Sequence, residues 1–216
     1  MNQSRSIALT VALVLLFITV IVGGFVYRIT QPRVMTDAEM QLNGLFLHSA
    51  PRNFGELDLV DHRGEPFTRA RFEGQWSLVF FGFTHCPDIC PTTMTFLDEF
   101  VASLEGTEVE ETQVVMVSVD PARDTVEALS TYVPYFNPEF VGVTGEFLDV
   151  HRFATALNTP FRKVMLEDGN YTIDHGTNVA LVNPRGDYHG FFKSPLDLGK
   201  MKVTYRSARV LWDKAY

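Results

Sequence analysis

The hydrophobic pattern of the chain begins with a long apolar stretch near its amino terminus. Residues from Ile7 to Tyr27 carry no charge and are mostly valine, leucine, isoleucine and alanine. A helix of about 20 such residues crosses the hydrocarbon core of a bilayer. The stretch therefore predicts a transmembrane anchor over residues 7–27, preceded by a short flank over residues 1–6.

A cleaved secretory signal is the alternative explanation of this stretch. Two features favour an uncleaved anchor. The apolar run exceeds the roughly 7–15 residues typical of a signal sequence, and Phe25–Arg28 stands where a signal carries small residues for cleavage. The flanking charges do not set an orientation, because Arg5 lies on one side and Arg28 and Arg33 lie on the other.

Beyond this stretch, residues 28–50 are expected to form a tether and residues 51–216 a folded domain. Two continuous apolar runs in the domain, Trp76–Phe83 and Val114–Val119, are typical of strands buried on both faces of a sheet. Turn signals separate further short strands, which are expected at residues 57–60, 66–67, 140–143, 164–166, 171–173, 178–182 and 188–192.

Helical spacing alternates with these strands. From Thr92 to Leu104, apolar residues recur at intervals of three and four, which predicts one buried helix face. Helices are also expected over residues 124–135 and 146–157, and Ser194-Pro195-Leu196-Asp197 reads as a capping box that opens a terminal helix.

This order of elements predicts an α/β fold in which helices flank a central sheet, in the arrangement of a thioredoxin-like domain. Sites in such folds form in the loops at the carboxyl ends of the strands.

The charge balance limits the partners of this domain. The chain has 26 acidic residues against 18 basic ones, and a net charge of −8 argues against nucleic acid, because phosphate binding needs clustered lysine and arginine.

The chain has two cysteines, Cys86 and Cys90, and they close too short a loop to brace a domain. Their role is therefore local, in redox chemistry, metal binding or both. They follow the first buried strand, and Pro91 is expected to be the first helical residue, with Cys90 just outside the helix. The helix dipole is then expected to lower the pKa of the thiols.

The C-x3-C spacing is compatible with a disulfide and equally with a metal site. Paired thiolates select soft ions, copper(I) foremost, whereas a structural zinc site takes four protein ligands. A three-coordinate copper(I) site needs one ligand beyond the two sulfurs. Four candidates for it are His85, Met94, His151 and His175.

These candidates differ in their expected surroundings. His85 is expected to point away from the sulfurs, Met94 to lie in the core, and His151 to be a solvated or core histidine on a helix. His175 lies in a polar loop that faces the cysteine turn in a thioredoxin-like fold. The residues alone leave His175 open as either a ligand or a surface-loop histidine.

Several motifs together resemble the Sco/SenC family, the copper-binding assembly factors of cytochrome c oxidase. The motifs are Cys86–Thr92, Val117–Thr125, Asp174-His175 and Leu181–Gly186. The resemblance runs from about Phe54 to Trp212 and implies that Cys86, Cys90 and His175 bind copper, as copper(I) with copper(II) as a second state. Gly176 departs from the small hydroxyl residue that is more common in the family.

The resemblance also implies partners and a location. It implies delivery of copper to the binuclear copper-centre subunit of cytochrome c oxidase, and an upstream copper donor. It implies a single-pass protein of the inner membrane with its domain in the periplasm, or alternatively in the mitochondrial intermembrane space. The absence of an evident arginine-rich transit segment favours the bacterial location.

Other interpretations of the same residues remain. One is a thiol–disulfide reductase that keeps the copper-site cysteines of an oxidase reduced, which needs Cys86 and Cys90 but not His175. Another is a copper or redox sensor. An enzymatic role is therefore left open, and a metallochaperone is preferred. The segment Asp120–Thr125 is expected to be a turn and helix cap, with a role near the copper loop as the alternative. Asp88 and Asp174 are expected either to orient His175 or favour copper(II), or to be solvated turn acids.

Overall fold

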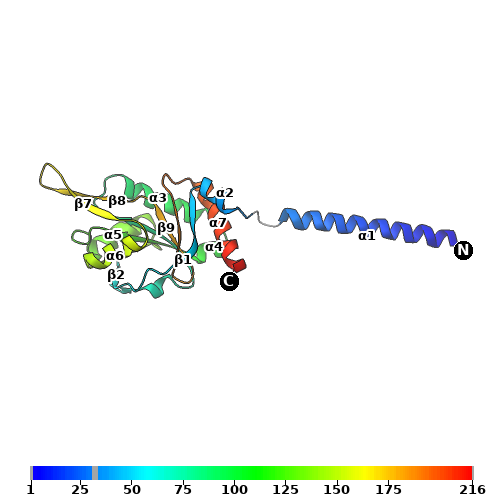
Figure 1. Cartoon of the computed structure of the whole chain (residues 1–216), viewed down its shortest axis with the longest axis horizontal. Helices are drawn as coiled ribbons and strands as arrows, with labels where there is room; N and C mark the ends of the chain where they lie inside the picture. Colours follow the sequence, from blue (N-terminus) through cyan, green and yellow to red (C-terminus); the bar gives the residue numbers. More distant parts are fainter. Residues whose placement is uncertain (1, 31–33, 216) are drawn as a thin grey trace. The chain divides into compact units, whose positions relative to one another are not determined.

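The computed structural model describes residues 2–30 and 34–215, and the chain divides into two compact units between Val34 and Met35. The first unit is helix α1 (Asn2–Thr30), shown in blue in Figure 1. Its segment Ile7–Ile29 is exposed and is long and apolar enough to cross a membrane, a test that a signal sequence also passes.

The second unit is built on an eight-stranded mixed sheet in the order β1-β10-β9-β4-β5-β6-β2-β3. Its strands are β1 (Leu45–Arg52), β2 (Leu59–Asp61), β3 (Pro66–Phe67), β4 (Trp76–Gly82), β5 (Thr112–Ser118), β6 (Val141–Gly145), β9 (Val179–Val182) and β10 (Tyr188–Phe192). The three strands β4, β5 and β6 are parallel, and β4 pairs antiparallel with β9. Strands β7 (Phe161–Met165) and β8 (Tyr171–His175) form a separate hairpin.

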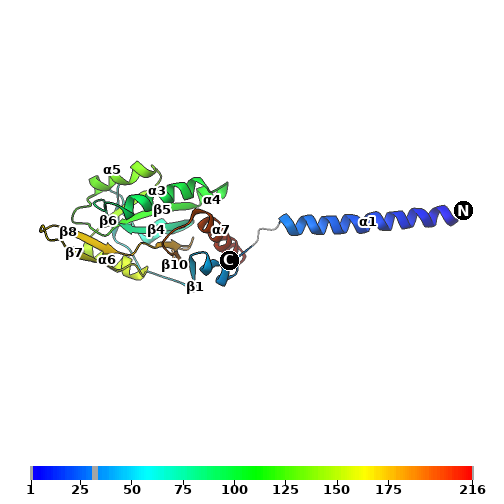
Figure 2. The same cartoon turned by 90° about the horizontal axis from the view of Figure 1, so that it is seen from above.

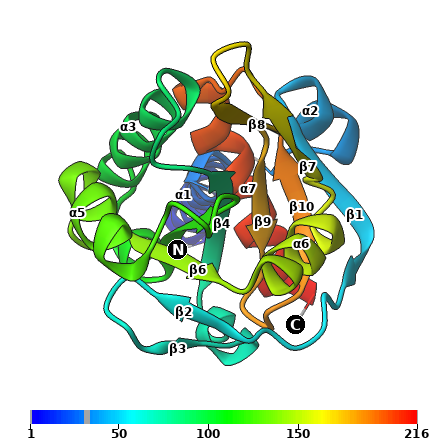
Figure 3. The ribbon, with the colours of Figure 1, turned by 90° about the vertical axis from the view of Figure 1, so that its left-hand side faces the viewer.

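Helices cover both faces of this sheet, as Figures 2 and 3 show. They are α2 (Asp37–Leu42), the 3-10 helix η1 (Arg69–Phe72), α3 (Ile89–Ala102), α4 (Thr107–Glu110), α5 (Val126–Phe136), α6 (Phe147–Ala156) and α7 (Leu198–Ala215). Helices α3, α5 and α7 lie on one face, where Phe100 packs edge-on against Tyr205. On the other face, Phe153 of α6 packs against Phe81 of β4.

The predicted α/β thioredoxin-like fold is confirmed. Every residue of β4 is buried, as the continuous apolar run predicted, and helices separate the strands in the order β4-α3-α4-β5-α5-β6. Parallel neighbours joined by helices place the carboxyl ends of β4 and β5 at one edge of the sheet, and the loop that carries both cysteines begins there.

The expected tether over residues 28–50 is wrong in its second half. Helix α2 begins with a reciprocal capping box between Thr36 and Glu39, and β1 pairs with β10 as a strand of the main sheet. Met40 and Leu45 are buried in the core. The folded unit therefore begins at Met35 rather than near Pro51, and the Thr36-x-x-Glu39 pattern was the sequence signal for it.

The terminal helix α7 begins later than predicted. Asp197, not Ser194, caps it, because the Asp197 carboxylate accepts a hydrogen bond from the Lys200 amide at 2.8 Å. The Ser194 amide instead donates to Asn178 Oδ1 at 3.1 Å, which ties the residue to the segment before β9.

Candidate metal centre

The two cysteines lie at the junction of β4 and α3. Cys86 sits in the turn after the strand, where its amide donates to the Phe83 carbonyl at 3.2 Å. Cys90 is the second residue of α3, so the expectation that it lies outside the helix is wrong. Pro91 is tolerated as the third residue because the first-turn N–H groups of a helix have no intrahelical acceptor.

The close packing of Cys90 depends on Gly82, the last residue of β4. A Cβ atom at this position would lie 2.7 Å from Phe80 Cε1 and 3.1 Å from Cys90 Sγ. Because both approaches are shorter than ordinary contacts, only glycine lets the Cys90 sulfur pack against the end of the strand.

His175 reaches the cysteines from the other side of the site. It is the last residue of β8, paired across the hairpin with Phe161, so it lies at a strand end rather than in the expected loop. The rings of Phe80 and Phe83 lie edge-on to its imidazole, with centroids 6.1 and 5.8 Å away. This apolar wall fixes the ring where it faces the sulfurs.

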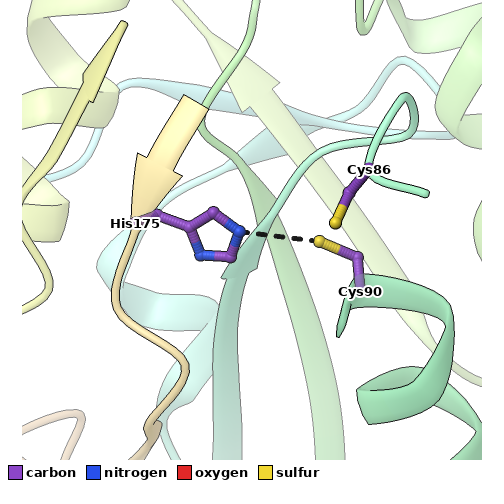
Figure 4. Close-up of side chains that lie close together, drawn as sticks. All are labelled: Cys86, Cys90 and His175. Carbon is purple, nitrogen blue, oxygen red and sulfur yellow. Dashed lines mark hydrogen bonds between the residues drawn. The ribbon is translucent and has the colours of Figure 1, made fainter. Parts of the chain in front are cut away.

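The hydrogen bonds of His175 define which nitrogen is free. Nδ1 lies 2.9 Å from the Gly176 carbonyl, which only accepts, so Nδ1 carries the proton. Nε2 then has a lone pair and lies 3.6 Å from Cys90 Sγ (Figure 4). The backbone contact at Nδ1 is the kind that orients metal-binding histidines in proteins.

The two sulfurs and this nitrogen form one compact donor set. All three ligand atoms lie within 4.8 Å of one another, and both cysteines are free thiols. Two soft sulfurs and one imidazole fit a soft cation such as copper(I), and the set is one ligand short of a structural zinc site.

Burial sets the protonation of the metal-free site. It raises the pKa of the Cys90 thiol far above its ordinary value, and the hydrogen bond that involves the Phe83 backbone opposes this only partly. The lowering expected from the helix dipole is therefore wrong for Cys90, because desolvation outweighs it. Burial also lowers the pKa of His175. A neutral imidazole and a protonated Cys90 thiol face each other, so metal binding must release a proton.

The other candidate ligands lie away from this set. His85 is exposed, with Nδ1 3.0 Å from Thr84 Oγ1, and Met94 is fully buried in the core, as expected for both. His151 is exposed on α6, where its ring packs at a tilt against Phe147 and edge-on against Phe161. Neither histidine belongs to the donor set found among the described residues.

The segment Asp120–Thr125, which follows β5, is both a turn with a helix cap and a contact to the strand that carries His175. Thr125 caps α5 by accepting a hydrogen bond from the Ala128 amide, and Arg123 pairs with Asp120, as expected for a turn and helix cap. Asp120 also accepts a hydrogen bond from the Tyr171 hydroxyl of β8 at 3.0 Å, which ties the segment to the strand that carries His175.

Asp124 is the residue of this segment whose particular contacts the sequence analysis did not predict. Its buried carboxylate accepts hydrogen bonds from the Thr84 amide, the Thr84 hydroxyl and the Ser118 hydroxyl at 3.0, 2.6 and 2.6 Å. Thr84 lies two residues before Cys86, so Asp124 anchors the start of the cysteine loop. Its position in the loop that follows the buried strand β5 was the available signal.

The two acids considered as partners of His175 lie in solvent. Asp174 is exposed and pairs with Arg162 across the hairpin at 3.0 Å. Asp88 is exposed at the start of α3, and its side chain makes no capping hydrogen bond. The solvated interpretation therefore describes both acids in this structure.

Comparisons with known proteins agree with this fold and site. The SCO1/SenC family model matches residues 48–207. A putative copper-binding protein of Stutzerimonas stutzeri is 37% identical over 171 residues, which cover 78% of this chain and 84% of that protein. The human mitochondrial protein SCO2 homolog is 40% identical over 156 residues, which cover 68% of this chain but only 58% of that protein.

A solved relative shows the same fold. The crystal structure of Arabidopsis thaliana ScoI with copper bound matches with a TM-score of 0.67 and 28% identity, over 73% of this chain and 98% of that one. Fold and site thus define a thioredoxin-like protein that carries a dithiol–imidazole donor set. The extent of the family match makes the assignment specific: the chain belongs to the SCO1/SenC family.

Proposed function

We propose that this protein is a membrane-tethered copper chaperone that holds one copper ion through Cys86, Cys90 and His175. The observation that carries the proposal is the compact donor set, two sulfurs and one nitrogen within 4.8 Å of one another. Membership of a family with copper-bound structures supports it, as does the similarity to a putative copper-binding protein.

The geometry supports capture and release of copper(I). As the ion binds, the thiols give up their protons, and Nε2 of His175 offers its lone pair without losing a proton. Three ligands leave the ion open to attack by a thiol of a partner. Cys86 is the more exposed of the two cysteines, so it is the ligand that a partner reaches first.

Oxidation of the site turns copper(I) binding off. If the two thiols form a disulfide, they release two protons and two electrons to an oxidant such as a partner disulfide, and both sulfur donors are lost. Copper(II) is a second oxidation state that the imidazole helps to hold.

The recipient in this proposal is the subunit that carries the binuclear copper centre of cytochrome c oxidase, and an upstream donor supplies the copper. The apolar helix α1 is the membrane anchor, with a single pass through the inner membrane and the domain in the periplasm; the mitochondrial intermembrane space is the alternative. The long exposed apolar segment Ile7–Ile29 and the similarity to a bacterial protein support this location.

Copper titration of the reduced protein tests the ligand set. The variants Cys86→Ser, Cys90→Ser and His175→Ala are each expected to lose tight copper(I) binding, because two donors cannot complete the site. His151→Ala is the matched control, since His151 lies outside the donor set and should keep wild-type affinity. Unchanged affinity in His175→Ala would refute the assignment of that ligand.

A thiol–disulfide reductase is the second candidate, because the two free thiols lie close enough to cycle between thiol and disulfide. An oxidase-assembly assay in cells that lack the wild-type protein separates the two functions. A chaperone needs all three ligands, so His175→Ala should fail as completely as either cysteine variant. Oxidase assembly that survives in His175→Ala but fails in the cysteine variants would identify the reductase.

A further inference from the structure

Asp124 has a fully buried carboxylate beside the proposed copper site, and among the described residues no lysine or arginine forms an ion pair with it. Asp124 is completely buried, and its three hydrogen bonds come from the neutral groups of Thr84 and Ser118. Buried carboxylates are ordinarily paired with a cation or a metal, because transferring an isolated charge from water is costly.

The other acids of this unit show what is unusual about Asp124. Asp120, on the same segment, pairs with Arg123, and the buried Asp61 has a guanidinium nitrogen of Arg71 at 3.6 Å. In the part of the chain that the structure describes, the one basic group within 4.0 Å of the Asp124 carboxylate is His85, with Nδ1 at 3.7 Å, and the neighbouring Arg123 pairs with Asp120 instead. The imidazole of His85 is mostly exposed, so solvent screens any charge that it carries.

The charge of Asp124 reaches the sulfur ligands. The Thr84 amide donates to Asp124 at 3.0 Å, and the carbonyl of the preceding residue, Phe83, accepts from the Cys86 amide at 3.2 Å, so the carboxylate lies at the base of the cysteine loop. Burial raises the pKa of Tyr132 on α5, and the charges of both cysteines and Asp124 raise it further. The Tyr132 hydroxyl is buried and makes no hydrogen bond. Asp124, the cysteine loop and the Tyr132 hydroxyl therefore form one region in which charges interact with little screening by water.

We propose that Asp124 acts as a fixed negative charge that favours copper(II) over copper(I) in the site, and so lowers the reduction potential of bound copper. This inference rests on the proposed function. Two thiolates and Asp124 together carry three negative charges, which copper(I) reduces to two and copper(II) to one. The region therefore stabilises the ion of higher charge more strongly. Asp124 acts through the field at the site and through the cysteine loop, so it is a positioning residue and not a ligand.

The test measures the one-electron copper(II)/copper(I) potential of the full-length protein, loaded with one copper ion in detergent micelles. Asp124→Asn removes the charge and keeps the shape. It is expected to raise the ratio of copper(I) affinity to copper(II) affinity about tenfold, which corresponds to a potential about 59 mV higher. Asp124→Ser, a smaller neutral substitution, gives a second reading of the same effect if the asparagine variant does not fold.

Two controls separate charge from structure. Thr84→Val loses one hydrogen bond to Asp124 but keeps its charge, so its potential should not rise. Asp61→Asn removes a buried carboxylate on β2, whose charge Arg71 already offsets, and should leave the potential unchanged. A potential that does not rise in the neutral variants, or that rises equally in Thr84→Val, would overturn the role of Asp124.

The same experiment distinguishes the two proposals. If wild-type protein loads one copper ion and the neutral variants show no rise in potential, the inference about Asp124 fails while the chaperone proposal stands. If wild-type protein loads no copper, the chaperone proposal fails and the inference fails with it. Copper stoichiometry is therefore measured on every variant before its potential.

Discussion

At the scale of single residues, burial decides which cysteine is reactive. Cys90 is fully buried, and desolvation raises the pKa of its thiol, whereas Cys86 is partly exposed in the turn before α3. Because the thiolate is the nucleophile, iodoacetamide should alkylate Cys86 much faster than Cys90 in the reduced, metal-free protein. Site-resolved mass spectrometry checks this. In urea-unfolded protein the two rates should converge, and equally fast labelling of both thiols in the folded protein would contradict the assignment.

The buried His189 is expected to make the free energy of unfolding depend on pH. Its ring packs edge-on against Trp76 and Trp212, and burial lowers its pKa to about 4, with a smaller contribution from the charge of His48. The unfolded chain, with an ordinary imidazole pKa near 6.5, binds more protons between these two values. The free energy of unfolding should therefore fall as pH falls from about 6.5 to about 4, by up to about 1.4 kcal/mol per pH unit from this residue.

Urea unfolding at several pH values, with tryptophan fluorescence as the readout, measures this slope. His189→Gln should show a shallower slope over the same pH range, because glutamine does not titrate. Buried histidines elsewhere in the domain contribute slopes of the same sign, so the variant should keep part of the dependence. Parallel curves for the wild type and His189→Gln would exclude this role.

The kind of site was predictable from the residue types in the sequence, but the position of His175 and the burial of Cys90 were not. Two cysteines and no others, directly after a buried strand, were enough to predict a soft-metal or redox site. The sequence alone left His175 open, because only the hairpin brings it to Cys90 Sγ, from 85 positions away. The raised pKa of Cys90 was missed because a local rule, the helix dipole, was applied without knowing how deeply the sulfur is buried.

At the scale of elements, long apolar runs and helical spacing predicted reliably which strands and helices form, but not the residues at which they begin and end. Strand β4 and helix α3 lie where their patterns predicted, because burial of whole faces specifies them strongly. The start of α7 was misplaced because Ser194 and Asp197 are both good capping residues in sequence. Only the Lys200 amide, which donates to Asp197, distinguishes them.

The cap of α7 can be tested by comparing substitutions at Asp197 and Ser194, the two candidate capping residues. Asp197→Ala should lower the free energy of unfolding by about 1 kcal/mol, because the Lys200 amide loses its acceptor. Ser194→Ala should have a much smaller effect, because Ser194 uses its backbone amide to bind Asn178. Urea titration of the two variants compares them directly. An equal or larger loss in Ser194→Ala would restore the capping box as first predicted.

At the scale of the whole molecule, the long apolar helix α1 was predictable from its continuous run of apolar residues, and the domain boundary was not. Segment 35–52 has a weak apolar pattern, so it looked like a tether. Its role depends on β10, which lies more than 130 residues further along the chain and pairs with β1 through Leu45↔Phe192. A long-range pairing of this kind leaves little local signal.

Two truncations test where the folded unit begins. A chain of residues 35–216 should fold and bind copper in the reduced state, because it keeps α2, β1 and the hydrogen bond from the Met35 amide to Ser207 Oγ. A chain of residues 51–216 loses the buried side chains of Met40 and Leu45 and leaves the edge of β10 unpaired. Losing two large core side chains costs several kcal/mol, a large part of the stability of a typical domain. The shorter chain should therefore unfold at a much lower urea concentration or aggregate through the exposed edge of β10. Cooperative unfolding of both chains at the same urea concentration would show instead that the folded unit begins near Pro51.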